Sequence, residues 1–372
     1  MKKVLFLLIA LFACFVLASC SKSDTYEIAV VTDVGQLRDG GFNEGTYTGA
    51  ENFAKANKIT YKYYQPANGA DATDNDRIAA MNQAIENGAK VIVTPGFLQA
   101  AAITAVAQEN PDVKFIFIDG WVLETEDKKV LPNVTAVSYK EEESGFLAGY
   151  AAVKDGYKNL GGTFGGGGSN AACNRFAYGY VQGIAAAAKE MGLTDVKVRV
   201  SFKYGSSFSA STELQTQVSA WYNDGVEIVF SCGGSMLQSV KAAAAETSKG
   251  MIIGVDVDQH GESDRVLTSA VKGLAASVEK ILGEFYDGKW DAQLGGKCSN
   301  LGAADDATGL PTADAAWRFK TFTKAEYEAL FKKVKAGSIQ IKNDVKDNMD
   351  SAEAWAALAE SIKANVTFSL DK

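Results

Sequence analysis

Residues 27–32 read Glu27-Ile28-Ala29-Val30-Val31-Thr32, a short β-rich run followed by a glycine-rich turn and a helix-like stretch that continues through Ala54. The same succession of a short apolar run and a helical stretch continues along the chain. The next strand-like runs are residues 59–64, 91–95 and 114–119. Short apolar runs separated by helices predict βαβ units, and therefore a parallel sheet with right-handed crossovers.

The alternation starts again in the second half of the chain. The strand-like runs there are residues 160–164, 197–202, 227–231 and 251–255. Two successive sets of strands and helices indicate two lobes of similar architecture, although no close sequence repeat relates them. We therefore predict an α/β protein with two lobes, each built on a parallel sheet.

The composition excludes several classes of protein. The chain is 47% hydrophobic and 22% charged, which is enough for a large core, and its formal charge of -8 argues against nucleic acid as a partner. Cys173, Cys232 and Cys298 are the cysteines of the globular part, so at most one disulfide is expected and no disulfide framework.

A lipid-attachment signal is expected at the N-terminus. Lys2 and Lys3 precede an apolar run from Val4 to Ala18, which is too short to span a bilayer comfortably. The run ends in Leu17-Ala18-Ser19-Cys20, which resembles the bacterial lipobox. We expect residues 1–19 to be a signal peptide and residues 20–25 a tether lipidated at Cys20, which would hold the protein at a bacterial cell membrane, outside the cytoplasm. The alternative is an ordinary signal peptide with an incidental cysteine.

The residues directly after each predicted strand are the candidate site, because ligands of open parallel sheets bind beyond the carboxyl ends of the strands. These segments combine carboxylates, aromatic rings and glycines, as in Asp39 to Asn43, Asp119 and Tyr204 to Phe208. Rings offer a stacking face and carboxylates accept hydrogen bonds, which suits a neutral ligand with a ring and several hydroxyl groups.

Four segments together resemble one protein family. They are Thr32-Asp33 through Gly41-Phe42-Asn43 for its TD-x-G…D-x-SFN pattern, 254–259 for GVDSDQ, 268–272 for TS-x-x-K and 322–324 for FTK. On these motifs the chain, over essentially its full length, resembles the basic membrane protein (Bmp) group of nucleoside-binding lipoproteins, also called purine nucleoside receptor A. It departs from the group at Gly41, where serine is usual, and at 232–235, where AAGGT is more usual.

The resemblance implies a type I periplasmic-binding-protein fold that captures purine nucleosides (guanosine, adenosine or inosine) in a cleft between the lobes and delivers them to the permease of an ABC transporter. The implied first lobe is 26–140 plus roughly 261–300, and the second is 141–260 plus roughly 301–372. The implied protein is a monomer without a cofactor. The predicted ligand residues are Asp33, Phe42, Asn43, Asp119, Phe176, Phe208, Gly233, Gly234, Asp256, Asp258 and Lys272.

By the same resemblance, Phe42 would stack on the base, and Asp33 and Asp119 would contact polar atoms of the base or ribose. Asp256 or Asp258, together with Lys272, would hold the ribose. Asp256 and Asp258 alternate along an extended segment and point to opposite sides, so only one should reach the ligand fully. A half-buried Lys272 needs a partner, for which either aspartate is a candidate.

Structural interpretations compete with these roles. Phe42 could be a core anchor, and Asp33 and Asp119 could cap the helices that follow them. Phe208 is the preferred second stacking face, and Phe176 is its rival.

The glycine run 161–168 lacks the Gly-Lys-Ser/Thr ending of a phosphate loop, so a close approach of the backbone is the favoured interpretation. His260 is the only histidine and no CxxC occurs, which leaves no zinc pattern, and we interpret His260 as a rim or hinge residue. Asp256 and Asp258 could ligate calcium, but no EF-hand loop is present. We therefore expect no metal and no catalysis. The alternatives are a nucleoside hydrolase, a receptor for another small sugar-like solute, or a structural surface lipoprotein.

Overall fold

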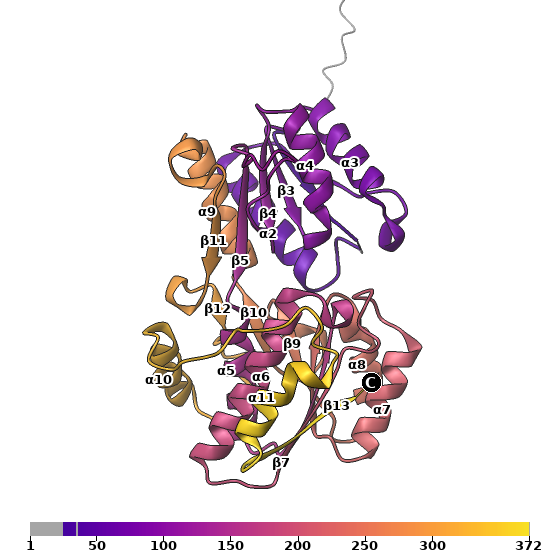
Figure 1. The fold of residues 1–372 in the computed structure, drawn as a ribbon, viewed down its shortest axis with the longest axis vertical. Coiled ribbons are helices and arrows are strands. Elements are labelled where there is room, and N and C mark those ends of the chain that lie inside the picture. The colour runs from indigo at the N-terminus through magenta and orange to yellow at the C-terminus, as the bar shows by residue number, and fades with distance from the viewer. Residues whose placement is uncertain (1–24, 35, 372) are drawn as a thin grey trace, which may run out of the picture.

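Two α/β lobes stack along the long axis of the molecule (Figure 1). The computed structural model describes residues 25–34 and 36–371. The predicted α/β class, with two lobes built on parallel sheets, is confirmed. The predicted signal peptide and the predicted lipid site Cys20 lie outside the described residues.

The first sheet has the strand order β11-β5-β4-β3-β1-β2, and all its neighbouring strands are parallel. Its strands are β1 (Ile28–Val31), β2 (Tyr61–Tyr64), β3 (Val91–Pro95), β4 (Lys114–Ile118), β5 (Val134–Tyr139) and β11 (Cys298–Leu301). Its main helices are α2 (Phe42–Asn57), α3 (Asp74–Glu86), α4 (Ala100–Glu109) and α9 (Leu274–Tyr286). Successive side chains of β1 enter different cores: Ile28 shares one with α2 and α9, and Ala29 shares the other with α3 and α4. Both faces are therefore buried, which explains the continuous apolar runs.

The second sheet has the order β12-β10-β9-β8-β6-β7-β13, in which only the β12–β10 pair is antiparallel. Its strands are β6 (Asn159–Phe164), β7 (Val196–Ser201), β8 (Ile228–Cys232), β9 (Met251–Asp256), β10 (Val266–Lys272), β12 (Thr308–Gly309) and β13 (Val366–Asp371).

Helices cover both faces of the second sheet as well. One core includes residues of α5 (Glu141–Lys154), α6 (Ala171–Glu190), α10 (Lys324–Lys335) and α11 (Ala352–Ile362), and the other includes α7 (Thr212–Asn223) and α8 (Met236–Ala245). Short helical turns complete the chain: η1 (Gly69–Asp71), η2 (Phe97–Gln99), η3 (Gly166–Gly168), η4 (His260–Glu262), η5 (Trp290–Leu294) and η6 (Ala303–Asp305).

Three short segments connect the lobes. The chain leaves the first sheet between β5 and α5 at Lys140, returns between β10 and α9 at Gly273, and leaves again between β11 and η6 at Gly302. The return predicted near residue 261 is therefore placed too early. Residues 266–272 form β10, which pairs in parallel with β9 and so belongs to the second lobe.

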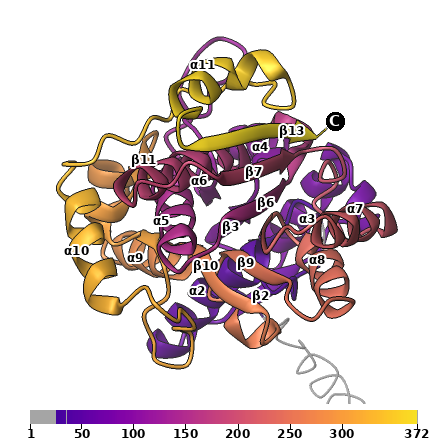
Figure 2. The same ribbon diagram turned by 90° about the horizontal axis from the view of Figure 1, so that it is seen from below.

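In each sheet, one edge strand comes from a segment far along the chain from the strand it pairs with. In the first lobe, β11 pairs with β5. In the second lobe, β13 at the end of the chain pairs with β7, and α11 lies beside β13 when the molecule is seen from below (Figure 2). Within residues 25–34 and 36–371, none of the helices has the length and apolar character needed to span a bilayer.

Candidate ligand-binding site between the lobes

A cavity lies between the two lobes at the carboxyl ends of their strands. About 740 Å³ of space between the lobes is not filled by protein atoms, a volume that includes open solvent. The wall includes every predicted ligand residue except Asp258, namely Asp33, Phe42, Asn43, Asp119, Phe176, Phe208, Gly233, Gly234, Asp256 and Lys272.

Lys272, the last residue of β10, joins the two lobes electrostatically. Its Nζ donates to both carboxylate oxygens of Asp119, at 2.6 and 2.9 Å, and lies 3.3 Å from Glu141 and 3.7 Å from Asp256. Burial lowers the pKa of Lys272, but these three carboxylates outweigh it, so the net shift is upward and the ammonium stays charged. Lys272 therefore has the acidic partner that its burial requires. The closest partner is Asp119, whereas the sequence had suggested Asp256 or Asp258.

Asp256 and Asp258 are separated as the alternation predicts. Asp256 is 6% exposed and lines the cavity, where burial raises its pKa to about 7 despite the nearby Lys272. Asp258 is exposed, lies outside this cavity and pairs with His260, with Nδ1–Oδ2 at 3.1 Å. The prediction of Asp258 as a ligand residue is therefore wrong for this cavity. Asp256, the last residue of β9, has a left-handed φ of 67°.

Asp33 follows β1 and depends on a glycine of the neighbouring strand. Burial raises the pKa of Asp33 to about 7, and its Oδ1 accepts a hydrogen bond of 2.6 Å from the amide of Val34. A Cβ on Gly96 would lie 1.9 Å from Asp33 Oδ2, and Gly96 has a φ of +101°. Only glycine fits there, so the sequence after β3 makes room for the Asp33 carboxyl group.

The start of α2 presents Phe42 to the cavity. Asp39 caps this helix by accepting from the amides of Gly41 at 2.9 Å and Asn43 at 3.0 Å. Asn43 donates to the carbonyl of Val34 at 3.1 Å, and its own Oδ1 is buried without a partner within the described residues. Phe42 is half-buried with its ring centroid 4.9 Å from Nζ of Lys272.

On the second-lobe side of the cavity, Phe208 packs against Gly165 and Gly234. A Cβ on Gly165 would lie 2.4 Å from the Phe208 ring, and one on Gly234 would lie 2.5 Å from its carbonyl oxygen. The interpretation of the glycine run as a close approach of the backbone is confirmed. Phe97, from the turn after β3, meets Phe208 across the cavity with ring centroids 6.3 Å apart.

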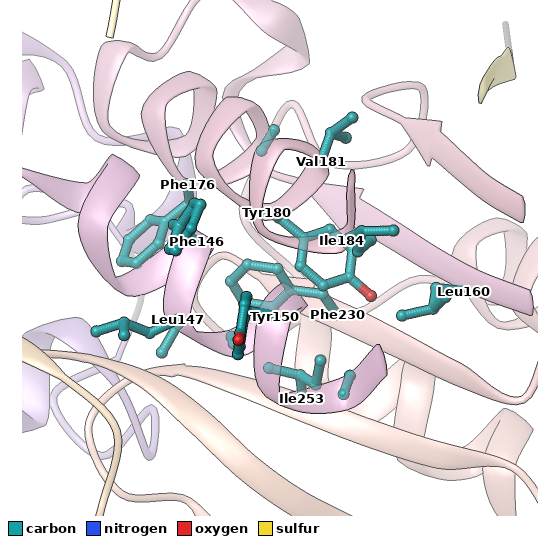
Figure 3. Close-up of a cluster of buried hydrophobic side chains, with 14 of the residues drawn as sticks. Phe146, Leu147, Tyr150, Leu160, Phe176, Tyr180, Val181, Ile184, Phe230 and Ile253 are labelled. Atoms are coloured by element: carbon teal, nitrogen blue, oxygen red, sulfur yellow. The ribbon is translucent and has the colours of Figure 1, made fainter. Parts of the chain in front are cut away.

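Phe176 differs from Phe208 in its surroundings. It is 1% exposed, and its ring meets that of Phe230 edge-on at 5.9 Å inside the second-lobe core, where Phe146 and Tyr180 are neighbours (Figure 3). Phe208 is half-buried and packs only at the edge of that core. Phe176 therefore contributes to the core as well as to the cavity wall.

Three residues of the cavity wall have strained backbone conformations. Asp119, Phe208 and Asp256 adopt φ angles of 57°, 56° and 67°, a left-handed region that non-glycine residues enter at a cost of roughly 1–3 kcal/mol. Such conformations are typical of ligand sites. The three side chains are thus positioned by the backbone before any ligand arrives.

Sequence reasoning missed several residues of the site. Phe97 follows β3 directly, so the post-strand rule could have found it. Glu141 follows β5, which was not recognised as a strand. Within residues 25–34 and 36–371, no group of three or more His, Cys, Asp or Glu side chains is placed to hold a metal ion.

Comparison with known proteins assigns the chain to a family. The family model Bmp, described as ABC transporter substrate-binding protein PnrA-like, matches residues 26–345. The chain belongs to the Bmp family. It is an ABC transporter substrate-binding protein, and the motifs that suggested this resemblance contribute Asp33, Phe42, Asp256 and Lys272 to one cavity.

Individual members of the Bmp family match over most of their length. The ABC transporter nucleoside-binding protein BmpA of Lactococcus lactis subsp. cremoris is 31% identical over 313 residues, which cover 76% of this chain and 84% of that protein. Basic membrane protein A1 of Borrelia garinii subsp. bavariensis is 26% identical over 311 residues, covering 82% of this chain and 86% of that protein.

A solved structure shows the same architecture. The solute-binding protein of an ABC transporter system from Aeropyrum pernix K1 has a TM-score of 0.73 at 20% sequence identity, and the match covers 91% of this chain and 98% of that one. The fold is therefore that of the type I periplasmic binding proteins, as predicted.

Proposed function

We propose that this protein captures purine nucleosides by closing its two lobes over them and delivers them to the permease of an ABC transporter. The observation that carries the proposal is the pairing, in one interlobe cavity, of half-buried Phe42 and Phe208 with the carboxylates of Asp33, Asp119 and Asp256. Aromatic faces suit a base, and carboxyl oxygens accept hydrogen bonds from vicinal hydroxyl groups. The name of the Lactococcus relative, a nucleoside-binding protein, supports the same ligand class.

In this proposal, Phe42 and Phe208 stack on the base, while Phe176 acts mainly through the core. Asp256 accepts from the ribose, and Lys272 keeps the carboxylates of Asp119 and Asp256 oriented toward the ligand. The ligand is bound and released unchanged. The charge of the wall supports a neutral ligand, because added phosphate would face several acidic groups and only one lysine.

Calorimetry on the purified protein tests the proposal. Guanosine, adenosine and inosine should bind far more tightly than the corresponding free bases, since a site that hydrogen-bonds hydroxyl groups leaves polar groups unpaired when they are missing. Asp256→Asn should remove most of this difference, and Asp258→Asn, two residues away and outside the cavity, is the matched control. Equal affinity for base and nucleoside would refute the ribose contact.

Two further measurements separate this proposal from its rivals. Release of free base from inosine during incubation would indicate a hydrolase. Binding of a pentose or hexose with no binding of nucleoside would indicate a receptor for another sugar-like solute. We further propose that the protein acts as a lipid-anchored monomer, with Cys20 as the lipidated residue.

A further inference from the structure

The first turn of α5 contacts all three segments that connect the lobes. Glu141 begins this helix directly after the first connection and lies 3.3 Å from Lys272, which ends β10 directly before the second. Glu143 accepts from the amide of Ala303, at 2.5 Å, beside the third connection. Ser144 donates to the carbonyl of Val271 at 2.7 Å.

Glu141 occupies a distinctive place in this turn. Its side chain is fully buried and does not line the cavity. Its Oε1 faces Lys272, and its Oε2 accepts a hydrogen bond of 2.5 Å from Nε of Arg175 on α6. A buried carboxylate shared by two cations fixes the direction of both side chains. Lys272 is thereby held on one side by the helix that begins the second lobe and on the other by Asp119 of the first lobe.

We propose that Glu141 is a positioning residue that couples the ligand cavity to the connections between the lobes by holding Lys272 against Asp119 and Asp256. This role rests on the proposed function, because it deepens the account of the same nucleoside site. Glu141 does not touch the ligand. It acts by keeping the lysine in the one orientation that neutralises both cavity carboxylates while the lobes are closed.

The variant Glu141→Gln keeps the size of the side chain and removes its charge. Affinity for inosine should fall by about tenfold or more, because a hydrogen bond between buried charged groups is lost. The matched control is Glu142→Gln, the next residue, which is 3% exposed and accepts from Asn343 rather than from Lys272. This control should bind inosine nearly as the unmodified protein does.

The pH dependence of binding separates positioning from a loss of packing. The charged or titratable groups that face Asp256 are Asp39, Asp119, Glu141, Cys232 and Lys272. Binding should strengthen as Asp256 ionises. Lys272 lowers the pKa of Asp256 more than Glu141 raises it. A Glu141→Gln protein that no longer holds Lys272 beside Asp256 should therefore move the midpoint of this profile to higher pH, whereas loss of the Glu141 charge with Lys272 still in place would move it to lower pH. Glu141→Asp keeps the charge and should restore the midpoint even if its shorter side chain lowers affinity.

The outcomes are distinguishable. A folded Glu141→Gln protein with unchanged affinity and midpoint overturns the role of Glu141 alone, as does an equal shift in Glu142→Gln. If the unmodified protein binds no nucleoside, the proposed function fails and this role fails with it. Thermal melting of each variant shows whether it is folded under the conditions of the measurement.

Discussion

Phe97 from the first lobe meets Phe208 from the second across the cavity, with their ring centroids 6.3 Å apart and their planes at 62°. The two residues belong to different lobes, so this contact depends on how closely the lobes approach each other. An aromatic pair of this kind contributes roughly 0.5–1.5 kcal/mol beyond the burial of its area.

The first prediction follows from that contact. Phe97→Ala should accelerate nucleoside dissociation by a few-fold to about tenfold and leave association nearly unchanged, because the pair stabilises the closed state. Stopped-flow fluorescence measures both rates. Phe53→Ala is the control, since Phe53 stacks on Tyr286 at 5.6 Å and does not line the cavity. Equal effects of the two substitutions would contradict a role for Phe97 in retaining the ligand.

The second prediction separates stacking from packing. Phe42→Ala and Phe208→Ala should each cost roughly 1–3 kcal/mol of nucleoside binding with little change in the melting of the ligand-free protein. Phe176→Ala should instead lower the free energy of unfolding by roughly 3–5 kcal/mol, because it leaves a cavity in the core. Melting curves and calorimetry on the three variants check this, and a stable Phe176→Ala protein that has lost binding would reverse the assignment.

The third prediction concerns Lys272. Lys272→Met leaves Asp119 and Glu141 without their shared cation and should destabilise the protein by roughly 3–5 kcal/mol at neutral pH. Lys272 holds down the pKa of Asp119, which burial raises, so this pKa should rise further in the variant and the folded state should bind a proton that the unfolded chain releases. The loss should therefore be smaller at pH 5 than at pH 8. Urea unfolding at both values tests this, and a pH-independent loss would argue against buried carboxylates as its cause.

The fourth prediction uses the pKa of Asp33, which burial raises to about 7. The ordinary value in an unfolded chain is about 4. Between these values the folded state binds the extra proton, so this group makes the ligand-free protein less stable as pH rises from about 4 to 7. Asp33→Asn should reduce that decline, giving a variant that is relatively more stable above pH 7. Unfolding curves at several pH values would show a parallel decline in both proteins if Asp33 titrates normally.

The fifth prediction concerns the N-terminus. Cys20→Ser should leave the protein unprocessed or released from the membrane, because acyl chains on Cys20 are the anchor that the sequence predicts. Metabolic labelling with a fatty acid, followed by membrane fractionation, measures this. Cys298→Ser is the control, since Cys298 lies on the exposed edge strand β11. Fatty-acid labelling of the Cys20→Ser protein at the normal level would contradict lipid attachment at Cys20.

Local sequence patterns were sufficient for the strands with strong apolar runs. All eight runs named from the sequence overlap observed strands, β1 to β4 and β6 to β9. Two of the missed strands have weak local signals: β11 is largely exposed and β12 has only two residues, so their pairing depends on distant partners. β5 and β10 are buried and β-rich, so their local pattern was present but was not recognised. The return to the first lobe was predicted too early because residues 266–272 were interpreted as a binding motif and not as a strand of the second sheet.

The residues of the site were easier to name than their pairings. The post-strand rule brought Asp33, Asp119 and Asp256 to one cavity because parallel strands share a carboxyl edge. It could not show that Lys272 would form its closest ion pair with Asp119, since these residues lie in different lobes and the distance between them depends on how the lobes dock. The alternation of side chains indicated that only one of Asp256 and Asp258 would face the ligand, but it could not show which one, since that depends on how β9 sits in the second sheet.

The late strands β11 and β13 determine when this chain can fold. The first sheet is incomplete until residues 298–301 have been synthesised, and the second needs residues 366–371 from the very end of the chain. Contacts between such distant segments form slowly, because a long loop must close before they stabilise the fold. A growing polypeptide therefore cannot complete either core on the ribosome before nearly all of it has been made. That delay accords with the signal peptide predicted at residues 1–19, because such a signal directs a chain that is still unfolded to a secretion channel.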